Sequence, residues 1–145
     1  MVRKIGLLLL SAIVVFAFVS PADANVRRFG NIEANVPSGW TVEDADFQLT
    51  FTAPGDAAIV SIITDEMEEG LTIEEIAAEI SDEVGGNSPS SVGDGMFEFF
   101  FYNEHGIQSY VLVNEIDGTG LYMTWVIAGT HPDMETLLSS IRWVD

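Results

Sequence analysis

The sequence predicts an α+β domain in which two helices flank an antiparallel sheet of about six strands, in the chain order βββαβββα. Short runs rich in β-branched and aromatic residues are separated by turns that contain Pro, Gly and Asp. One capped amphipathic segment lies in the middle of the chain, and a second lies near its C-terminal end. Because the strands come in two consecutive groups, hairpins and antiparallel pairing are favoured over parallel βαβ units.

Residues 1–24 have the pattern of a secretory signal peptide. Arg3 and Lys4 precede an apolar run over residues 5–19, and a small-residue ending with alanines follows it. The run is shorter than the about 20 residues that a membrane span needs. We therefore expect a single mature domain over residues 25–145, periplasmic or secreted, with no membrane span after cleavage.

Composition limits the classes of partner. The formal net charge is −18 at pH 7, and excision of the predicted signal peptide would remove two cations and one carboxylate. The mature chain would keep Arg27, Arg28 and Arg142 as its fixed cations. Such an acidic surface repels nucleic-acid phosphates and anionic lipid head groups, so neither is an expected partner. The absence of cysteine excludes disulfides, a lipid-bearing cysteine and thiolate chemistry.

The first group of strands is predicted before residue 65. Turn signals at residues 37–39 and 54–56, both containing Pro and Gly, divide this part of the chain. The predicted extended segments cover residues 29–36, 40–42, 47–52 and 57–64, with the middle two read as one interrupted strand.

A first helix is predicted after the acidic residues 65–69. Thr72 and Glu75 form a capping-box pattern at its start, and Gly85-Gly86 supply a stop signal. The apolar stripe expected to be buried consists of Ile73, Ile76, Ala77, Ile80 and Val84.

The second group of strands is predicted over residues 96–103, 107–115 and 121–128. A closing helix follows, with Pro132 suited to its first turn. We expect this helix to run to Trp143 with one apolar face, formed by Met134, Leu137, Leu138 and Ile141.

This order of elements resembles the PsbP-like superfamily, which includes the DcrB-type small exported bacterial proteins. The resemblance rests on the element order, on VPSGW at residues 36–40 and on SIRW at residues 140–143. Relatives in this group are generally non-catalytic accessory, assembly or binding factors, so the resemblance implies a binding role without naming a partner. The chain departs from the lipoprotein members because it lacks the lipobox cysteine, and no functional residue carries over.

The aromatic run MFEFFFYN at residues 96–103 is the most unusual stretch of the chain. Two-residue turns at His105-Gly106 and Asp117-Gly118 would place Phe99 opposite Leu112. The face predicted to be core then carries Phe97, Phe99, Phe101, Leu112, Met123 and Trp125. The other face is predicted to form a groove for a ligand or peptide partner, lined by Glu98, Phe100, Tyr102 and Tyr122.

Carboxylates are concentrated between residues 65 and 83. They form either a solvated surface or a Ca²⁺ site, although no EF-hand spacing is present. Ca²⁺ is the only cofactor that the sequence brings into consideration. The residues of this candidate metal site are Asp65, Glu66, Glu68, Glu69, Glu75, Glu79 and Glu83.

His105 and His131 are most simply exposed loop residues, because one imidazole does not match a usual zinc set. No serine has the context of a nucleophile elbow, and no phosphate-binding glycine loop is present. Three functions stay open: a non-catalytic envelope domain that binds a protein or peptide, a cation-binding acidic envelope protein, and an unrecognised hydrolase.

Overall fold

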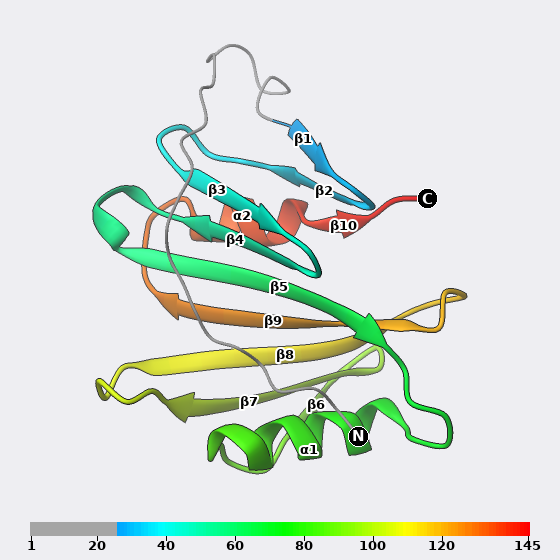
Figure 1. Ribbon diagram of the computed structural model, residues 1–145. Coiled ribbons are helices and arrows are strands. Elements are labelled where there is room, and N and C mark those ends of the chain that lie inside the picture. The colour runs from blue at the N-terminus through cyan, green and yellow to red at the C-terminus, as the bar shows by residue number, and fades with distance from the viewer. Residues whose placement is uncertain (1–25) are drawn as a thin grey trace.

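A computed structural model describes residues 26–145 as an α+β fold with two sheets and two helices (Figure 1). The large sheet has seven strands in the order β3-β4-β5-β9-β8-β7-β6, and the small sheet has three in the order β1-β2-β10. All strand pairs are antiparallel. The predicted α+β class, antiparallel pairing and pair of helices are confirmed, whereas the number and order of the strands differ. The predicted signal peptide lies outside the described residues.

The bounds of the elements follow the chain. The large sheet consists of β3 (Thr41–Ala45), β4 (Gln48–Thr52), β5 (Ala58–Glu66), β6 (Ser90–Gly93), β7 (Met96–Tyr102), β8 (Gln108–Ile116) and β9 (Leu121–Gly129). The small sheet consists of β1 (Val26–Phe29), β2 (Ile32–Asn35) and β10 (Arg142–Trp143). The remaining elements are the helices α1 (Ile73–Val84) and α2 (Met134–Ser140) and a short 3₁₀ turn, η2 (Pro54–Asp56).

Two tight turns explain the extra strands in the first part of the described chain. At Gly30 the backbone enters the left-handed region, with φ of 63°, and reverses between β1 and β2. At Phe47 it does the same, with φ of 67°, between β3 and β4. Glycine takes this conformation freely, but phenylalanine rarely does, so the second turn has no residue signal in the sequence.

Helix α1 forms as the sequence predicts. Thr72 accepts a hydrogen bond from the N–H of Glu75, and the Glu75 carboxylate accepts one from the N–H of Thr72. Gly85 ends the helix in a left-handed conformation. No helix of the described chain combines the length and the apolar content needed to cross a membrane.

The closing helix is shorter than expected. Helix α2 ends at Ser140, Ile141 is extended and buried, and β10 pairs with β2 through Arg142 opposite Glu33 and Trp143 opposite Ile32. The prediction that the helix continues to Trp143 was therefore wrong. An apolar residue that faces the core does so equally well from a helix or from a strand, so its spacing alone cannot separate the two.

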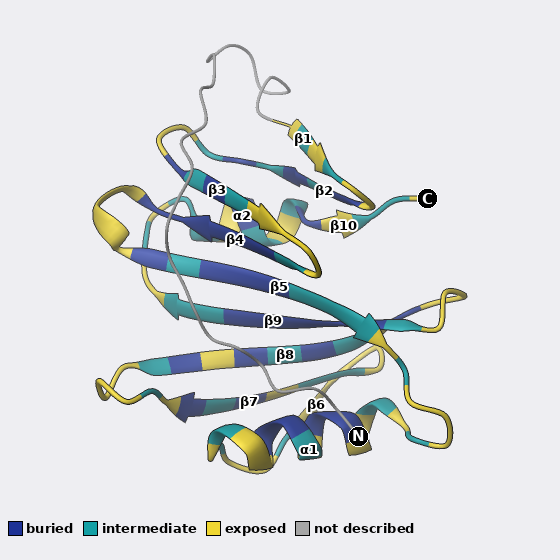
Figure 2. Cartoon of the chain, in the orientation of Figure 1, coloured by how far each residue is buried: buried dark blue, intermediate teal, exposed yellow. Residues whose placement is uncertain are grey.

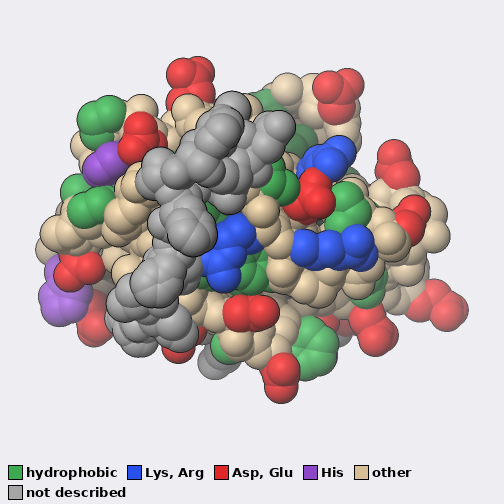
Figure 3. Space-filling view, turned by 90° about the horizontal axis from the view of Figure 1, so that it is seen from above, with side chains coloured by type: hydrophobic (Ala, Val, Ile, Leu, Met, Phe, Trp, Pro, Cys, Tyr) green, Lys and Arg blue, Asp and Glu red, His purple; other side chains and the backbone are tan. Residues whose placement is uncertain are grey.

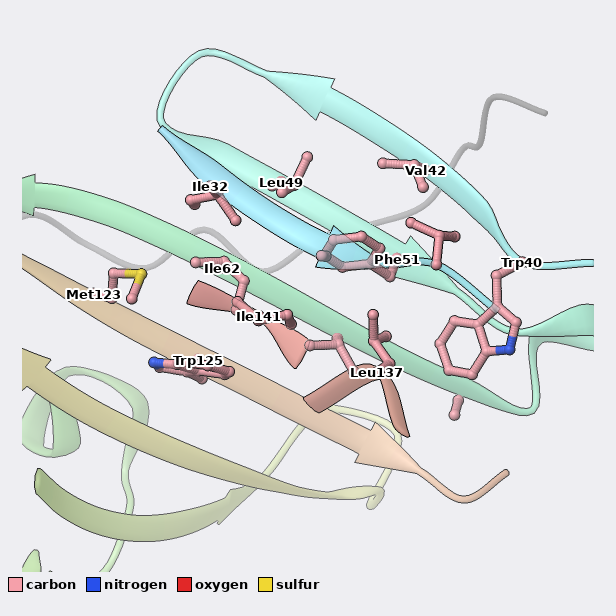
Figure 4. Packing of buried hydrophobic residues seen from close by; sticks show 14 of the residues in the cluster. Ile32, Trp40, Val42, Leu49, Phe51, Ile62, Met123, Trp125, Leu137 and Ile141 are labelled. Carbon is pink, nitrogen blue, oxygen red and sulfur yellow. The ribbon is translucent and has the colours of Figure 1, made fainter. Parts of the chain in front are cut away.

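The two helices cover opposite faces and different parts of the large sheet. Helix α1 packs its buried residues Ile76 and Ile80 against Phe99 and Val111 of β7 and β8. On the other face, α2 and the small sheet cover β3, β4, β5 and β9, and Figure 4 shows Phe51, Ile62 and Leu137 converging there. The fold therefore has two hydrophobic cores, one on each side of a twisted sheet.

The register of the aromatic strand differs from the prediction. Phe99 lies opposite Val111, which lies opposite Val126, so these residues share the face covered by α1. Leu112 lies opposite Trp125 on the other face. The six residues predicted as one core face are thus divided between the two cores. Phe97, Phe99 and Phe101 pack with α1, whereas Leu112, Met123 and Trp125 pack with α2 and the small sheet.

The cause is the loop between β7 and β8. It spans residues 103–107 and has an odd length, because Tyr102 pairs with Gln108. The Asn103 side-chain oxygen accepts hydrogen bonds from the N–H groups of His105 (2.8 Å) and Ile107 (3.0 Å), which closes the loop. A change of one residue in register turns the assumed facing of a strand over, because successive side chains point to opposite faces.

Candidate functional site

Part of the large sheet carries aromatic side chains that belong to neither core. Helix α2 and the small sheet extend over one half of their face of the sheet, and β7 and β8 form the other half. Phe100, Tyr102 and Tyr110 lie on this open half and are absent from both hydrophobic clusters of the described chain. Tyr102 is 60% exposed and Tyr110 is 51% exposed. We call these three residues the aromatic patch.

The rings of the aromatic patch contact one another. Phe100 lies opposite Tyr110 in the register, with ring centroids 6.3 Å apart, and it makes an edge contact of 6.1 Å with Tyr102. Gln108 donates a long hydrogen bond of 3.4 Å to the Tyr102 hydroxyl. Phe100 and Leu112 are half-buried beneath the two tyrosines. The patch is therefore a preorganised cluster with an apolar base and two hydroxyl groups at its surface.

Figure 2 shows this contrast along the sheet. Strands β5 and β9 are buried along most of their length, whereas β8 contains an exposed segment within otherwise buried sequence. Isolated exposed apolar residues are ordinary on protein surfaces, but a contiguous group is characteristic of interaction sites.

Asn87 positions the patch from the chain segment just after α1. Its side chain accepts a hydrogen bond from the N–H of Phe100 (2.7 Å), and its own N–H donates to the Phe100 carbonyl (3.1 Å). Both backbone groups of Phe100 are thus already paired on the β6 side. A partner would contact the side chains of the face here rather than add a strand at this point of the edge.

The charges near the patch are negative. Glu98 lies on the same face of β7, and Glu104 lies in the loop after it, both exposed. The fixed cations of the described chain are Arg27, Arg28 and Arg142, at its two ends. Figure 3 views the molecule from above the small sheet, where arginine side chains gather and carboxylates lie along much of the outline. The patch and its surroundings therefore favour a partner with basic groups.

The predicted groove is only partly assembled. Glu98, Phe100 and Tyr102 share one face of β7, but Tyr122 lies on the opposite face, buried in the core beneath α1. The prediction that Tyr122 lines the same groove was wrong for the reason given above, the odd loop length. Tyr110 takes its place and was missed, since the assumed register assigned it to the core.

The candidate metal residues are spread over several elements. Asp65 and Glu66 end β5, Glu68 and Glu69 lie in the following loop, and the remaining three are on α1. Glu75 belongs to the helix cap. Among the described residues, no group of three or more His, Cys, Asp or Glu side chains is arranged to hold a metal ion.

His131 has a structural environment. It is only partly exposed, its ring makes an edge contact with buried Trp40 at 5.3 Å, and its Nδ1 accepts a hydrogen bond from the N–H of Asp133 (3.1 Å). His131 therefore fixes the entry to α2, contrary to the expectation of a fully exposed loop residue. His105 lies on the exposed loop, as expected.

A cleft of about 450 Å³ lies at the other end of the same sheet face, between the small sheet and the β3–β4 turn. Its walls include Phe29, Phe47 and Trp143. Asp65 and Glu66, which the sequence placed in a candidate metal site, also line it.

Comparisons with known proteins bear on the fold. No family model matches the chain, and no curated protein matches it significantly. A solved structure, described as a mutant of the protein Mog1, is similar with a TM-score of 0.55 and 13% sequence identity, covering 80% of this chain and 92% of that chain. At this identity the similarity supports the α+β fold alone.

Proposed function

We propose that this protein is a non-catalytic binding domain of the cell envelope and that the aromatic patch is its contact surface for a protein or peptide partner. The observation that carries the proposal is the position of Phe100, Tyr102 and Tyr110 on an open sheet face, outside both cores. Tyrosine supplies large contact area and a hydroxyl at low entropic cost, and aromatic residues are enriched where proteins bind each other.

The chemistry of the surface specifies the partner. The apolar base formed by Phe100 and Leu112 suits an apolar side chain, and the neighbouring carboxylates of Glu98 and Glu104 suit lysine or arginine. The partner is therefore a protein segment that presents apolar and basic side chains together.

Two sequence features support the wider proposal. The pattern of residues 1–24 predicts export, which places the partner in the envelope or outside the cell. The proposed kinship with the PsbP-like superfamily, whose members are generally binding or assembly factors, agrees with a role without catalysis.

The test is site-specific crosslinking followed by measured binding. A photo-crosslinking amino acid at position 102 or 110 should capture a discrete partner in cells, whereas the same group at exposed Glu74 on α1 should not. The captured protein, once purified, should bind the unmodified chain in solution. Tyr102→Ser with Tyr110→Ser should weaken that binding about tenfold or more, as for residues at an interface centre.

Both tyrosines are exposed, so the double variant should unfold at the same temperature as the parent, and loss of binding would not reflect misfolding. Glu74→Gln is the matched control on another surface. Equal binding by the double variant and the parent would refute the proposal, as would equal crosslinking from position 74.

A further inference from the structure

The cleft at the opposite end of the sheet face from the aromatic patch is a second site, distinct from the proposed partner surface. Its two walls are rows of paired residues. In the small sheet, Phe29 pairs with Ile32 and Ile32 with Trp143, so the three side chains share one face. Figure 1 shows the β1–β2 turn, the β3–β4 turn and the end of β5 at the same end of the molecule.

The large sheet supplies the facing wall. Asp44 pairs with Leu49, and Leu49 pairs with Ile62, in a row that meets the small sheet across the cleft. The volume of about 450 Å³ falls within the range of about 300–1,000 Å³ that small-molecule sites occupy. The cleft therefore has apolar walls and enough space for a small organic ligand.

Phe47 lies at this cleft in an unusual conformation. Its backbone φ is 67°, and its side chain is 74% exposed. Its carbonyl accepts a hydrogen bond from the N–H of Thr64 (3.1 Å), which fixes the turn beside β5. A large ring held in a left-handed turn and left in solvent contributes little to folding, whereas it extends the aromatic wall beyond Phe29 and Trp143.

The charge of the cleft has one sign. Its lining includes the carboxylates of Asp44, Asp46, Asp65 and Glu66, and no Lys or Arg is among the described lining residues.

The nearby arginines are engaged elsewhere. Arg142 pairs with Glu33, which lies on the alternate row of the small sheet, and Arg28 donates to the carbonyls of Gly30 and Asp145. Arg27 lies over the Phe29 ring at 5.2 Å but does not line the cleft.

We infer that this cleft binds a small organic cation, such as an amine or quaternary ammonium compound with an apolar body. Aromatic faces attract weakly hydrated organic cations, and carboxylates at the rim add Coulombic attraction. A divalent metal ion fits less well, because Ca²⁺ takes six to eight oxygen ligands and no such group is arranged among the described residues.

The experiment is a titration of the full mature chain with benzyltrimethylammonium, followed by ¹⁵N NMR. Saturable shifts should appear at the indole N–H of Trp143 and the amides of Asp44 and Asp46, and not at Tyr102 or Tyr110. Benzyl alcohol, which is similar in shape but neutral, should bind at least about tenfold more weakly if the carboxylates contribute as proposed.

Variants locate the site. Phe47→Ala and Asp46→Asn should each weaken binding about threefold to tenfold, while Glu115→Gln, an exposed carboxylate outside the cleft, should have no effect. All three positions are exposed, so the variants should keep the parent spectrum outside the cleft.

Three outcomes would overturn the inference. The first is an absence of saturable shifts at millimolar probe, and the second is equal affinity for benzyl alcohol. The third is the same set of shifts with Na⁺ or Mg²⁺ at matched ionic strength, which would indicate charge screening alone. Because the aromatic patch lies at the other end of the sheet face, failure here would leave the crosslinking test of the partner surface unaffected.

Discussion

Three residues determine local geometry that a wider pattern could not. Thr72 starts α1, Phe47 reverses the chain between β3 and β4, and Asn103 closes the loop between β7 and β8. In each case a side chain or a backbone conformation replaces a regular hydrogen bond at the end of an element. Substitutions at such positions test the local structure with little change to the cores.

Replacing Thr72 should destabilise the protein by a known mechanism. The Thr72 hydroxyl accepts from the N–H of Glu75 at 3.1 Å, and loss of an N-cap side chain costs about 0.5–2 kcal/mol. We expect Thr72→Ala to lower the free energy of unfolding by about 1 kcal/mol in urea titrations. Thr72→Ser, which keeps the hydroxyl, should stay close to the parent, and equal values for the two variants would argue against the cap.

Replacing Phe47 should stabilise the protein. A non-glycine residue in this backbone region costs about 1–3 kcal/mol, and asparagine tolerates the conformation better than phenylalanine. Since the side chain is mostly exposed, Phe47→Asn should raise the free energy of unfolding by about 1 kcal/mol. Phe47→Ala keeps the unfavourable conformation and serves as the control in the same urea titration. If asparagine were no better than alanine, the turn would not be strained.

Such a gain would bear on the cleft as well. A residue that lowers stability and does not fill a core is commonly retained for function. Phe47→Asn should therefore be more stable than the parent and yet bind benzyltrimethylammonium more weakly.

At the scale of elements, the long antiparallel pair of β5 and β9 holds the two cores together. It contributes Val60 and Ile62 to the core beneath α2, and Tyr122 and Val126 to the core beneath α1. Because side chains alternate along each strand, both cores depend on the same register. Errors at the end of this pair should therefore affect the whole molecule.

Gly129 tests that pairing. Its φ is 79°, and a Cβ there would clash with the backbone carbonyl oxygen of Ala57. Gly120, with φ of 77°, has open space around the same position. Both alanine variants carry the left-handed cost of about 1–2 kcal/mol, but only Gly129→Ala adds overpacking of about 1–3 kcal/mol. Equilibrium unfolding should separate the two variants, and equal losses would mean that the β5–β9 end relaxes freely.

For the whole molecule, the dominant feature is its negative charge. The formal net charge is −18, and the repulsion among the carboxylates opposes the compact state. Both proposed sites use this property, because each selects a partner or ligand that carries positive charge. Stability and binding should consequently respond to ionic strength in opposite directions.

Salt should stabilise the fold. The Debye length falls from about 30 Å to about 8 Å as ionic strength rises from about 0.01 M to 0.15 M, so the thermal unfolding temperature should increase by several degrees, as a gain of about 1 kcal/mol would give. Replacing Glu74, Glu79 and Glu83 on α1 by Gln should reduce this increase. Ca²⁺ and Mg²⁺ at equal ionic strength should act alike, and a rise specific to Ca²⁺ would instead indicate a metal site in residues 65–83.

The sequence by itself determined the elements that depend on neighbours along the chain. The spacing of Ile76, Ala77 and Ile80 defines the buried stripe of α1, and Thr72 with Gly85 defines its ends. The apolar runs also place β7, β8 and β9 within a residue or two of their observed bounds. These features are local, because a helix or strand pattern is complete within one segment.

The tertiary structure alone decided which segments pair and which faces remain open. β10 pairs with β2 from the far end of the chain, and the odd loop at residues 103–107 separates Tyr122 from the aromatic patch and brings in Tyr110. Alternation along a strand specifies two faces but not which of them meets a given neighbour. That choice depends on loop length and on packing between residues distant in sequence, and it determines where both proposed sites lie.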